Sequence, residues 1–249
     1  MILSSKNNPL IKETASLKDK KGRKALGLFL VEGVKMCKEV LRSGLEIERF
    51  FVAESYDGEP FPQEKTVVIA DELLRVLSDE KTPQKVICRV KIPQNNLSAP
   101  KNACLILDGV ADPANVGAII RTANASGYNE IYLTPDCADI YSPKSVRASM
   151  SGVFFVKTHI ATREEILSLM DGTPIIVADM DGENAFTFTA PKKFALVIGN
   201  EGNGVSSIMQ QNAEKTVKIP MADTQESLHA SVSAGILMYL LKQDEFKNN

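Results

Sequence analysis

Residues 107–123 read Leu-Asp-Gly-Val-Ala-Asp-Pro-Ala-Asn-Val-Gly-Ala-Ile-Ile-Arg-Thr-Ala, an aliphatic run followed by a polar turn and a helical pattern. Asp112 and Pro113 favour a turn, and Asn115 is a good N-cap for the helix that follows. Arg121 would then lie one to two turns into this helix, within reach of a phosphate or carboxylate near its start. A capped helix with a solvated arginine would give the same pattern.

The sequence on either side of this stretch alternates short strands with helices. Continuous aliphatic runs are typical of parallel strands that are buried on both faces. We expect strands at 103–107, 130–133, 154–157, 174–178, 194–198 and 216–219, and helices at 116–126, 142–150, 163–170, 206–210 and 229–242. In such an open parallel sheet, ligands bind at the carboxyl ends of the strands.

The first part of the chain predicts a smaller α/β domain. We expect strands at 28–31, 47–52, 67–69 and 86–90, helices at 6–19 and 34–41, and a third helix capped by Asp71. Residues 92–102 contain two prolines and three asparagines, which indicates a connection. We therefore expect one domain at 1–93, a linker at 94–102 and a second domain at 103–249.

Charge is unevenly distributed over the 249 residues, whose net charge is −2. Residues 1–100 carry 17 Lys and Arg against 14 Asp and Glu, a net charge of +3, and the remainder carries 12 against 17, a net charge of −5. The total excludes a strongly basic nucleic-acid binder. The first 24 residues alone carry +5, which favours a polyanion contact, with a solvated terminus as the alternative.

Several classes of protein are excluded by composition. The apolar and charged fractions, 44% and 24%, are those of a folded globular chain. Four scattered cysteines and two histidines, His159 and His229, offer no zinc pattern, so we expect no metal and a reducing, cytoplasmic location. No apolar run approaches the roughly 20 residues of a membrane span, and the first residues do not resemble a signal peptide.

Two further polar loops follow expected strands. Residues 198–206 read Ile-Gly-Asn-Glu-Gly-Asn-Gly-Val-Ser, where three glycines permit close backbone approach to a ligand and Glu201 can accept hydrogen bonds. Their spacing fits neither a phosphate loop nor a dinucleotide fingerprint. In the third loop, Ser227 or His229 opens the last helix, and Met221 and Leu228 form apolar walls or core contacts. A hydrolase-type Ser–His pair is disfavoured because no G-x-S-x-G motif is present.

The order and spacing of these loops resemble the SpoU/TrmH family of RNA ribose 2′-O-methyltransferases, within the SPOUT superfamily. The family's D-P-x-N-x-G-x-x-x-R-T-A matches 112–123, its G-N-E-G-x-G matches 199–204, and its I-P-M…S-L-N matches 219–221 and 227–229. The first domain resembles the family's RNA-binding extension through less specific signals.

The resemblance implies a mostly parallel C-terminal sheet with helices on both faces and a trefoil knot, plus a small N-terminal α/β RNA-binding domain. It also implies a homodimer whose active site is completed across the subunit interface, and S-adenosylmethionine as cofactor, bound mainly by backbone groups. The implied cofactor-binding residues are Gly199, Ile219, Met221 and Leu228.

For catalysis, the resemblance places Arg121 at the ribose hydroxyl, oriented by Asn115 and Glu201, with Ser227 positioning the substrate. A guanidinium is a poor base, so Arg121 either removes the proton with special help or clamps a phosphate while water takes the proton. The family's last Asn is His229 here. His229 supplies the base, or is a tolerated replacement at a helix start, or marks a member with weak activity or another substrate.

The first domain favours ribosomal RNA over transfer RNA as substrate, because short members that act on transfer RNA usually lack it. The cations expected to contact RNA are Lys20, Lys21, Arg23, Lys24, Lys144 and Arg147. An antibiotic-resistance methylase of ribosomal RNA has the same architecture. The alternative from another class is an RNA-binding protein that has lost turnover.

Overall fold

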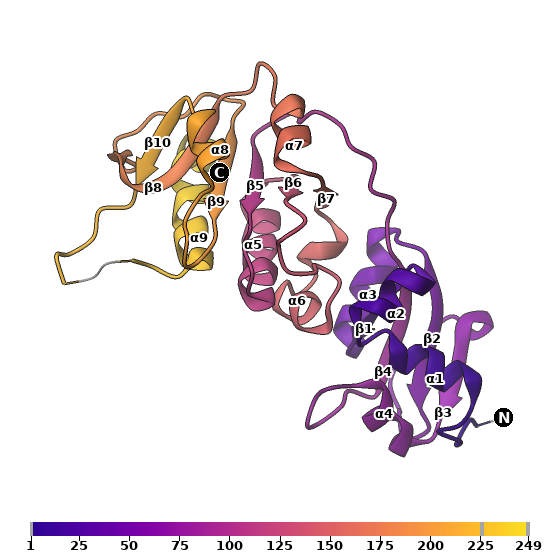
Figure 1. Ribbon diagram of the computed structural model, residues 1–249. Helices are drawn as coiled ribbons and strands as arrows, with labels where there is room; N and C mark the ends of the chain where they lie inside the picture. The colour runs from indigo at the N-terminus through magenta and orange to yellow at the C-terminus, as the bar shows by residue number, and fades with distance from the viewer. Residues whose placement is uncertain (1, 225–226, 248–249) are drawn as a thin grey trace. The chain divides into compact units, whose positions relative to one another are not determined.

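The computed structural model describes residues 2–224 and 227–247, whose helices and strands are shown in Figure 1. The chain forms two compact units. The first contains the residues up to Gln94 together with Asp139–Phe154, and the second contains Asn95–Ala138 together with the residues from Phe155 onward. The first unit therefore includes a segment from the middle of the chain.

The first unit is built on a four-stranded sheet in the order β1-β4-β2-β3. Strand β4 is antiparallel to both β1 and β2, and β3 is parallel to β2. The strands are β1 (Leu28–Glu32), β2 (Ile47–Ala53), β3 (Thr66–Ile69) and β4 (Val86–Lys91). The helices are α1 (Pro9–Ser16), α2 (Lys20–Leu26), α3 (Val34–Ser43), η1 (Gln63–Lys65), α4 (Asp71–Leu77), α6 (Pro143–Ala148) and η2 (Gly152–Phe154).

Successive side chains of a strand point to opposite faces of the sheet, and in this unit the two faces pack against different parts of the chain. Leu30 and Ile87 belong to a buried cluster with residues of α1 and α4. Phe29 points the other way, and its ring lies 4.8 Å from that of Tyr141 and 6.4 Å from that of Phe154. The inserted segment thus completes the core of the first unit.

The helix expected over 6–19 is wrong in extent, because α1 covers only Pro9–Ser16 and a second helix, α2, follows it. Asn8 caps α1 by accepting a hydrogen bond from the main-chain amide of Leu10 at 2.9 Å. Helix α2 then begins at Lys20, and its only buried residue is Arg23. A helix whose buried position is an arginine has no apolar periodicity, and sequence patterns therefore do not reveal it.

The second unit contains a six-stranded sheet in the order β10-β8-β9-β5-β6-β7, and every pairing is parallel. The strands are β5 (Cys104–Asp108), β6 (Glu130–Leu133), β7 (Lys157–Ile160), β8 (Ile175–Asn184), β9 (Ala195–Gly199) and β10 (Lys215–Lys218). The helices are α5 (Pro113–Ala125), α7 (Arg163–Leu169), α8 (Ser207–Gln211), α9 (Ala230–Leu241) and α10 (Gln243–Phe246). The predicted parallel α/β sheet is confirmed.

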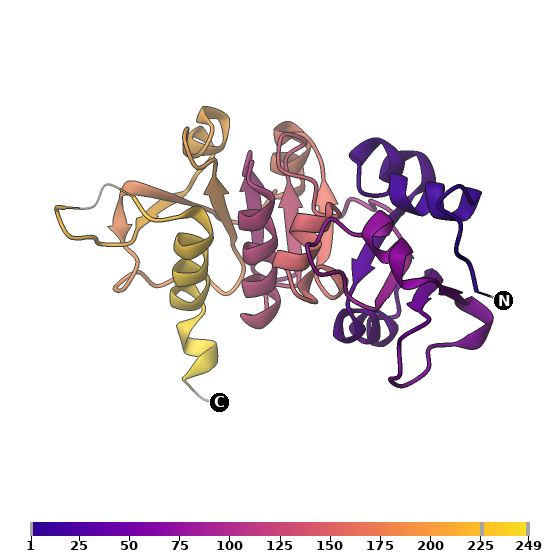
Figure 2. The ribbon, with the colours of Figure 1, turned by 90° about the horizontal axis from the view of Figure 1, so that it is seen from below.

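Helices cover both faces of this sheet (Figure 2). On one face, Ile166 of α7 and Met209 of α8 pack on a buried cluster that includes Ile106 and Val197. Helices α5 and α9 contact each other and lie on the other face. No helix in the described part of the chain has the length and apolar character needed to cross a membrane.

Two predicted helix caps are wrong. Asp71 is the first residue of α4 rather than its cap, which is Ala70. Helix α5 begins at Pro113, with Asp112 as N-cap, and the Asp112 carboxylate accepts hydrogen bonds from two amides of the first turn at 2.6 and 3.1 Å. Asn115 therefore lies inside the helix, where its side chain is free for other contacts.

The strand expected over 154–157 is also wrong. Its first residue ends the short helix η2, and the strand β7 begins at Lys157. Phe154 and Val156 are buried, but as core contacts outside the sheet. Strand β7 lies at the sheet edge, and His159 is its only buried residue, so it lacks the apolar run that marks the other strands.

Candidate active site

The candidate site lies where the direction of strand succession changes in the parallel sheet. Chain order runs from β5 to β6 and β7 on one side, whereas β9 and β8 lie on the other side of β5. The loops after β5 and β9 meet at their carboxyl ends, where Asn200 Nδ2 donates a hydrogen bond to the Gly109 carbonyl at 2.7 Å. Open α/β sheets bind ligands at such a switch point.

The loop after β9 is closed on itself. The main chain of Asn200 pairs with that of Gly204 through hydrogen bonds of 2.9 and 3.0 Å, and the Asn200 side chain accepts two more from residues 202 and 203. A Cβ atom on Gly199 would lie 2.3 Å from the carbonyl carbon of Gly204 and 2.4 Å from the amide of Val205. Glycine at 199 is thus required by the loop itself.

Glu201 projects from this loop to the start of α5. Its carboxylate accepts hydrogen bonds from Asn115 Nδ2 at 2.9 Å and from the amides of Ala111 and Asp112 at 3.2 and 3.4 Å. Burial by itself raises the pKa of Glu201, but these hydrogen bonds outweigh it, so the pKa lies below its ordinary value. Glu201 is therefore ionised at neutral pH and acts only as an acceptor.

Asn115 links Glu201 to the last helix. Its Oδ1 accepts a hydrogen bond from the hydroxyl of Ser231, in the first turn of α9, at 2.9 Å. The structure brings together Asn115 and Glu201, both of which the resemblance implies as residues that orient Arg121, whereas Ser231 is a site residue that sequence reasoning missed. The motif S-x-S at 231–233 was a weak signal, because it does not tell which serine faces α5.

A buried ion pair supports the floor of the site. The Asp108 side chain, in a residue that is 1% exposed, accepts a hydrogen bond from Arg163 Nε at 2.7 Å and from the Ser206 amide at 2.7 Å. Arg163 also pairs with Asp136 at 2.8 Å. These contacts tie the end of β5 to the starts of α7 and α8, so both ends of the 199–206 loop are fixed.

The third loop offers main-chain groups near the end of β10. Ile219, Met221 and Leu228 are half-buried, and none of them makes a main-chain hydrogen bond to another described residue. Ser227 is exposed, and His229 is the exposed N-cap of α9 without a side-chain capping bond. The prediction that His229 opens the last helix is confirmed.

Arg121 is exposed on α5. Because the helix begins at Pro113, Arg121 lies eight residues in, which is more than two turns and about 12 Å along the axis. In the described part of the chain, no hydrogen bond or ion pair joins Arg121 to Asn115 or Glu201. Its side chain is therefore available to an external group.

The comparison with known protein families adds direct evidence at this point. Residues 102–239, more than half of the chain, match the SpoU rRNA Methylase family. The chain belongs to this family. Residues 8–88 match the MRM3-like substrate binding domain. The three loops of the site lie within the SpoU match, and the basic segment around α2 lies within the other.

Individual SpoU-type relatives align over almost the whole chain. The 23S rRNA (guanosine(2553)-2′-O)-methyltransferase RlmP of Bacillus subtilis is 26% identical, over 96% of this chain and 98% of RlmP. A 23S rRNA (uridine(2479)-2′-O)-methyltransferase of Streptomyces viridochromogenes is 27% identical, over 95% and 90%. The crystal structure of the SpoU methyltransferase AviRb from that organism, in complex with the cofactor AdoMet, has a TM-score of 0.86, 26% identity and coverage of 96% and 99%.

The basic residues expected in the SpoU protein's substrate-binding region have different environments. Lys20, Lys21 and Lys24 are exposed on α2. Arg23 is only 4% exposed, and its guanidinium donates to Asp139 and to the main-chain carbonyls of residues 17 and 18. Arg23 therefore stabilises the first unit and does not present a cation at the surface.

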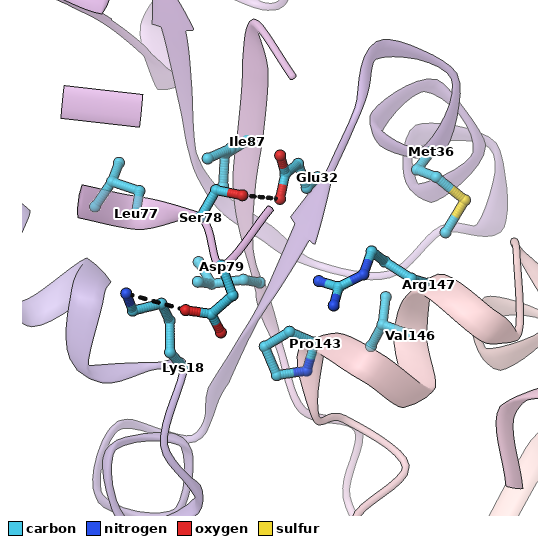
Figure 3. A pocket seen from close by; sticks show the side chains of 11 residues that line it. Lys18, Glu32, Met36, Leu77, Ser78, Asp79, Ile87, Pro143, Val146 and Arg147 are labelled. Atoms are coloured by element: carbon cyan, nitrogen blue, oxygen red, sulfur yellow. Dashed lines mark hydrogen bonds and ion pairs between the residues drawn. The ribbon is translucent and has the colours of Figure 1, made fainter. Parts of the chain in front are cut away.

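The two cations expected from α6 also differ. Lys144 is exposed, and Arg147 is partly buried and pairs with Glu80 at 2.9 Å. Figure 3 shows a small pocket of the first unit beside this pair. It is lined by Lys18, Leu30, Glu32, Met36, Leu77, Ser78, Asp79, Ile87, Pro143, Val146 and Arg147. Its volume of about 20 Å³ has room for water but not for a cofactor.

Metal ligands are not grouped in the described residues. Among residues 2–224 and 227–247, no three His, Cys, Asp or Glu side chains are placed so that they could hold a metal ion. The cysteines are free thiols, and three of the four are buried.

Proposed function

We propose that this SpoU family protein transfers a methyl group from S-adenosylmethionine to a ribose 2′-hydroxyl of structured RNA, with ribosomal RNA as substrate. The observation that carries the proposal is the hydrogen-bonded set of Asn115, Glu201 and Ser231 at the sheet's switch point, inside the matched family region. The names of RlmP and the Streptomyces relative support ribosomal RNA. These relatives modify different nucleosides, so the proposal stops at the class of RNA.

The loops fit the proposed cofactor. Gly199 leaves no room for a side chain and brings the main chain of the loop close to the sheet end. The main-chain groups of Ile219 and Leu228 have no partner among the described residues, which suits recognition of an adenine edge. We assign the half-buried Met221 to an apolar wall of the cofactor site. S-adenosylmethionine, when bound, supplies an activated methyl group, so the protein has only to align the hydroxyl and assist loss of its proton.

Arg121 is assigned to the ribose. A guanidinium stays protonated, so Arg121 acts best by clamping a phosphate and stabilising the developing oxyanion. We expect Arg121→Ala to abolish methyl transfer to ribosomal RNA while the Kd for S-adenosylmethionine stays within twofold of wild type. Calorimetry and incorporation of labelled methyl groups measure the two quantities. Near-normal turnover would overturn this assignment.

His229 is the candidate base. It is exposed at the start of α9 next to Ser227, which we assign to substrate positioning. If the imidazole takes the proton, the pH dependence of the transfer rate differs between wild type and His229→Asn. An identical pH profile for the variant would identify His229 as a tolerated replacement, with water as the proton acceptor.

RNA docking is assigned to the first domain. We divide the chain into a substrate-binding domain at 1–93, a linker at 94–102 and a methyltransferase domain at 103–249, and the two family matches support this division. The exposed Lys20, Lys21 and Lys24, with Lys144, would contact phosphates. Ribosomal RNA as substrate also favours a cytoplasmic location.

A homodimer is proposed from the surface of α9. Most residues of the helix are apolar, yet Val232 and Tyr239, seven residues apart on one side, are 49% and 43% exposed. A second copy would cover this side and bring its own loops to the site. Light scattering at micromolar concentration should give twice the chain mass. The trefoil knot that the resemblance implies stays a prediction.

Methyl incorporation into total ribosomal RNA, followed by mapping of the modified nucleotide, tests the function as a whole. Incorporation at a ribose 2′-oxygen is the expected result. Binding of both S-adenosylmethionine and RNA without incorporation would instead favour the alternative of a non-catalytic RNA-binding protein. Incorporation into a base would contradict the proposed chemistry.

A further inference from the structure

We propose that Ser231 is a positioning residue for methyl transfer, because its hydroxyl fixes the orientation of the Asn115 amide that holds Glu201. This proposal rests on the function proposed above. Three segments far apart in sequence meet here: α5 supplies Asn115, the loop after β9 supplies Glu201, and α9 supplies Ser231.

The polarity of this chain of hydrogen bonds follows from its members. An ionised carboxylate only accepts, so the amide of Asn115 must turn its NH₂ group toward Glu201. That orientation places Oδ1 at Ser231, 2.9 Å from its hydroxyl, and only a donor suits this position. The hydroxyl of Ser231 can donate, so each group in the chain has the partner that its chemistry requires.

The hydrogen bond from Ser231 holds the Asn115 amide in one orientation. Without a donor at residue 231, the Asn115 amide can rotate, and its hydrogen bond to Glu201 Oε1 becomes one of several arrangements. Glu201 would then be held only by the amides of Ala111 and Asp112, at the longer distances of 3.2 and 3.4 Å. Loss of one neutral hydrogen bond corresponds to roughly a fivefold lower kcat.

Helix α9 provides a matched control. Ser233 lies two residues further along the same helix and is likewise half-buried, but its side chain makes no hydrogen bond to a described residue. Ser231→Ala and Ser233→Ala remove the same atom from the same helix. A general effect on α9 would appear in both variants, whereas a positioning effect would appear only in the first.

The experiment combines kinetics with NMR. We expect Ser231→Ala to lower kcat about fivefold with unchanged KM for S-adenosylmethionine and RNA, Ser231→Thr to restore kcat to within twofold, and Ser233→Ala to match wild type. In an Asn115→Ala background, Ser231→Ala should have no further effect. An unchanged kcat for Ser231→Ala, or equal losses with and without Asn115, would overturn the proposal.

The side-chain amide signal of Asn115, assigned by its absence from Asn115→Ala, gives a readout that does not depend on turnover. It should shift in Ser231→Ala and stay in place in Ser233→Ala and His229→Asn. If wild type transferred no methyl group but these shifts occurred, the proposed function would fail, whereas the contact by which Ser231 orients the Asn115 amide would stand. If wild type were active and the signal did not respond to Ser231→Ala, the positioning role would fail alone.

Discussion

Replacement of Gly199 by alanine probes the site at the point where sequence and geometry constrain it most. The added Cβ would meet the carbonyl carbon of Gly204 at 2.3 Å, the amide of Val205 at 2.4 Å and the Gly204 carbonyl oxygen at 2.5 Å. All three are main-chain atoms, which cannot rotate away. To reach an ordinary contact of about 3.6 Å, the two chain segments must separate by more than 1 Å.

The magnitude follows from the hydrogen bonds that hold these segments together. The separation breaks the two main-chain bonds between Asn200 and Gly204, at 2.9 and 3.0 Å, and each contributes about 1 kcal/mol. The expected loss of about 2 kcal/mol corresponds to a fall in Tm of roughly 4–8 °C for a unit of this size. Because the main chain of Gly199 is assigned to the cofactor, we also expect affinity for S-adenosylmethionine to fall at least about tenfold.

Gly202→Ala is the matched control in the same loop. Its Cβ would find only Asn200 Oδ1, at 3.6 Å, and its backbone is not in the left-handed region. We expect its stability to change by no more than about 0.5 kcal/mol. The test compares the two variants in Tm, measured by calorimetry, and in the Kd for S-adenosylmethionine, measured by titration. A Gly199→Ala protein that melts and binds like wild type would refute the reasoning from close main-chain approach.

Three further outcomes are expected. Changing Lys20, Lys21 and Lys24 to Gln should weaken RNA binding and make the RNA affinity less dependent on salt concentration, as measured by filter binding. An unchanged salt dependence would mean that these side chains face solvent and do not contact RNA. Asp108→Asn should lower the free energy of unfolding, measured by urea denaturation, by about 2–3 kcal/mol, because Arg163 loses a buried partner. A decrease of less than about 0.5 kcal/mol would contradict the stabilising role of this ion pair. The lowered pKa of Glu201 contributes stability that is present at pH 7 and is lost as the pH falls through that pKa. The stability deficit of Glu201→Gln should therefore shrink as the pH is lowered, and a deficit that does not change with pH would count against this reasoning.

The strands that carry the site could be predicted because they are buried on both faces. The expected strands at 103–107 and 194–198 coincide with β5 and β9 to within one residue. A strand with aliphatic side chains on both faces produces a run that no surface segment imitates. Once both strands are parallel and adjacent, their polar loops must meet, in agreement with the family resemblance, which implies that Asn115 and Glu201 belong to one site.

Features that depend on tertiary contacts could not be predicted. Sequence patterns do not reveal helix α2, because its buried residue is Arg23, whose charge pairs with Asp139 more than a hundred residues later in the chain. The same contact reverses the role expected for Arg23. Nothing in the sequence near residue 23 indicates that a distant carboxylate pairs with this side chain, so the run of cations by itself predicts a single basic surface.

The partner of Asn115 illustrates the same limit within the site. Ser231 and Ser233 are both small hydroxyl residues in the first turn of one helix, and they lie about 200° apart around its axis. Only the packing of α5 against α9 decides which of them reaches Asn115. Sequence therefore identifies a helix suited to close packing, but not the hydroxyl that completes the hydrogen-bonded chain.

The departure from the family pattern at His229 gains a physical interpretation from this arrangement. Both ends of the Asn115 amide already have partners, Glu201 and Ser231, and neither contact involves the side chain at 229. His229 contributes to α9 through its carbonyl, which accepts from the amides of residues 232 and 233 at 2.9 Å. A change from Asn to His therefore leaves the hydrogen-bonded chain intact. The substitution therefore gives no structural reason for the contacts among Asn115, Glu201 and Ser231 to be lost.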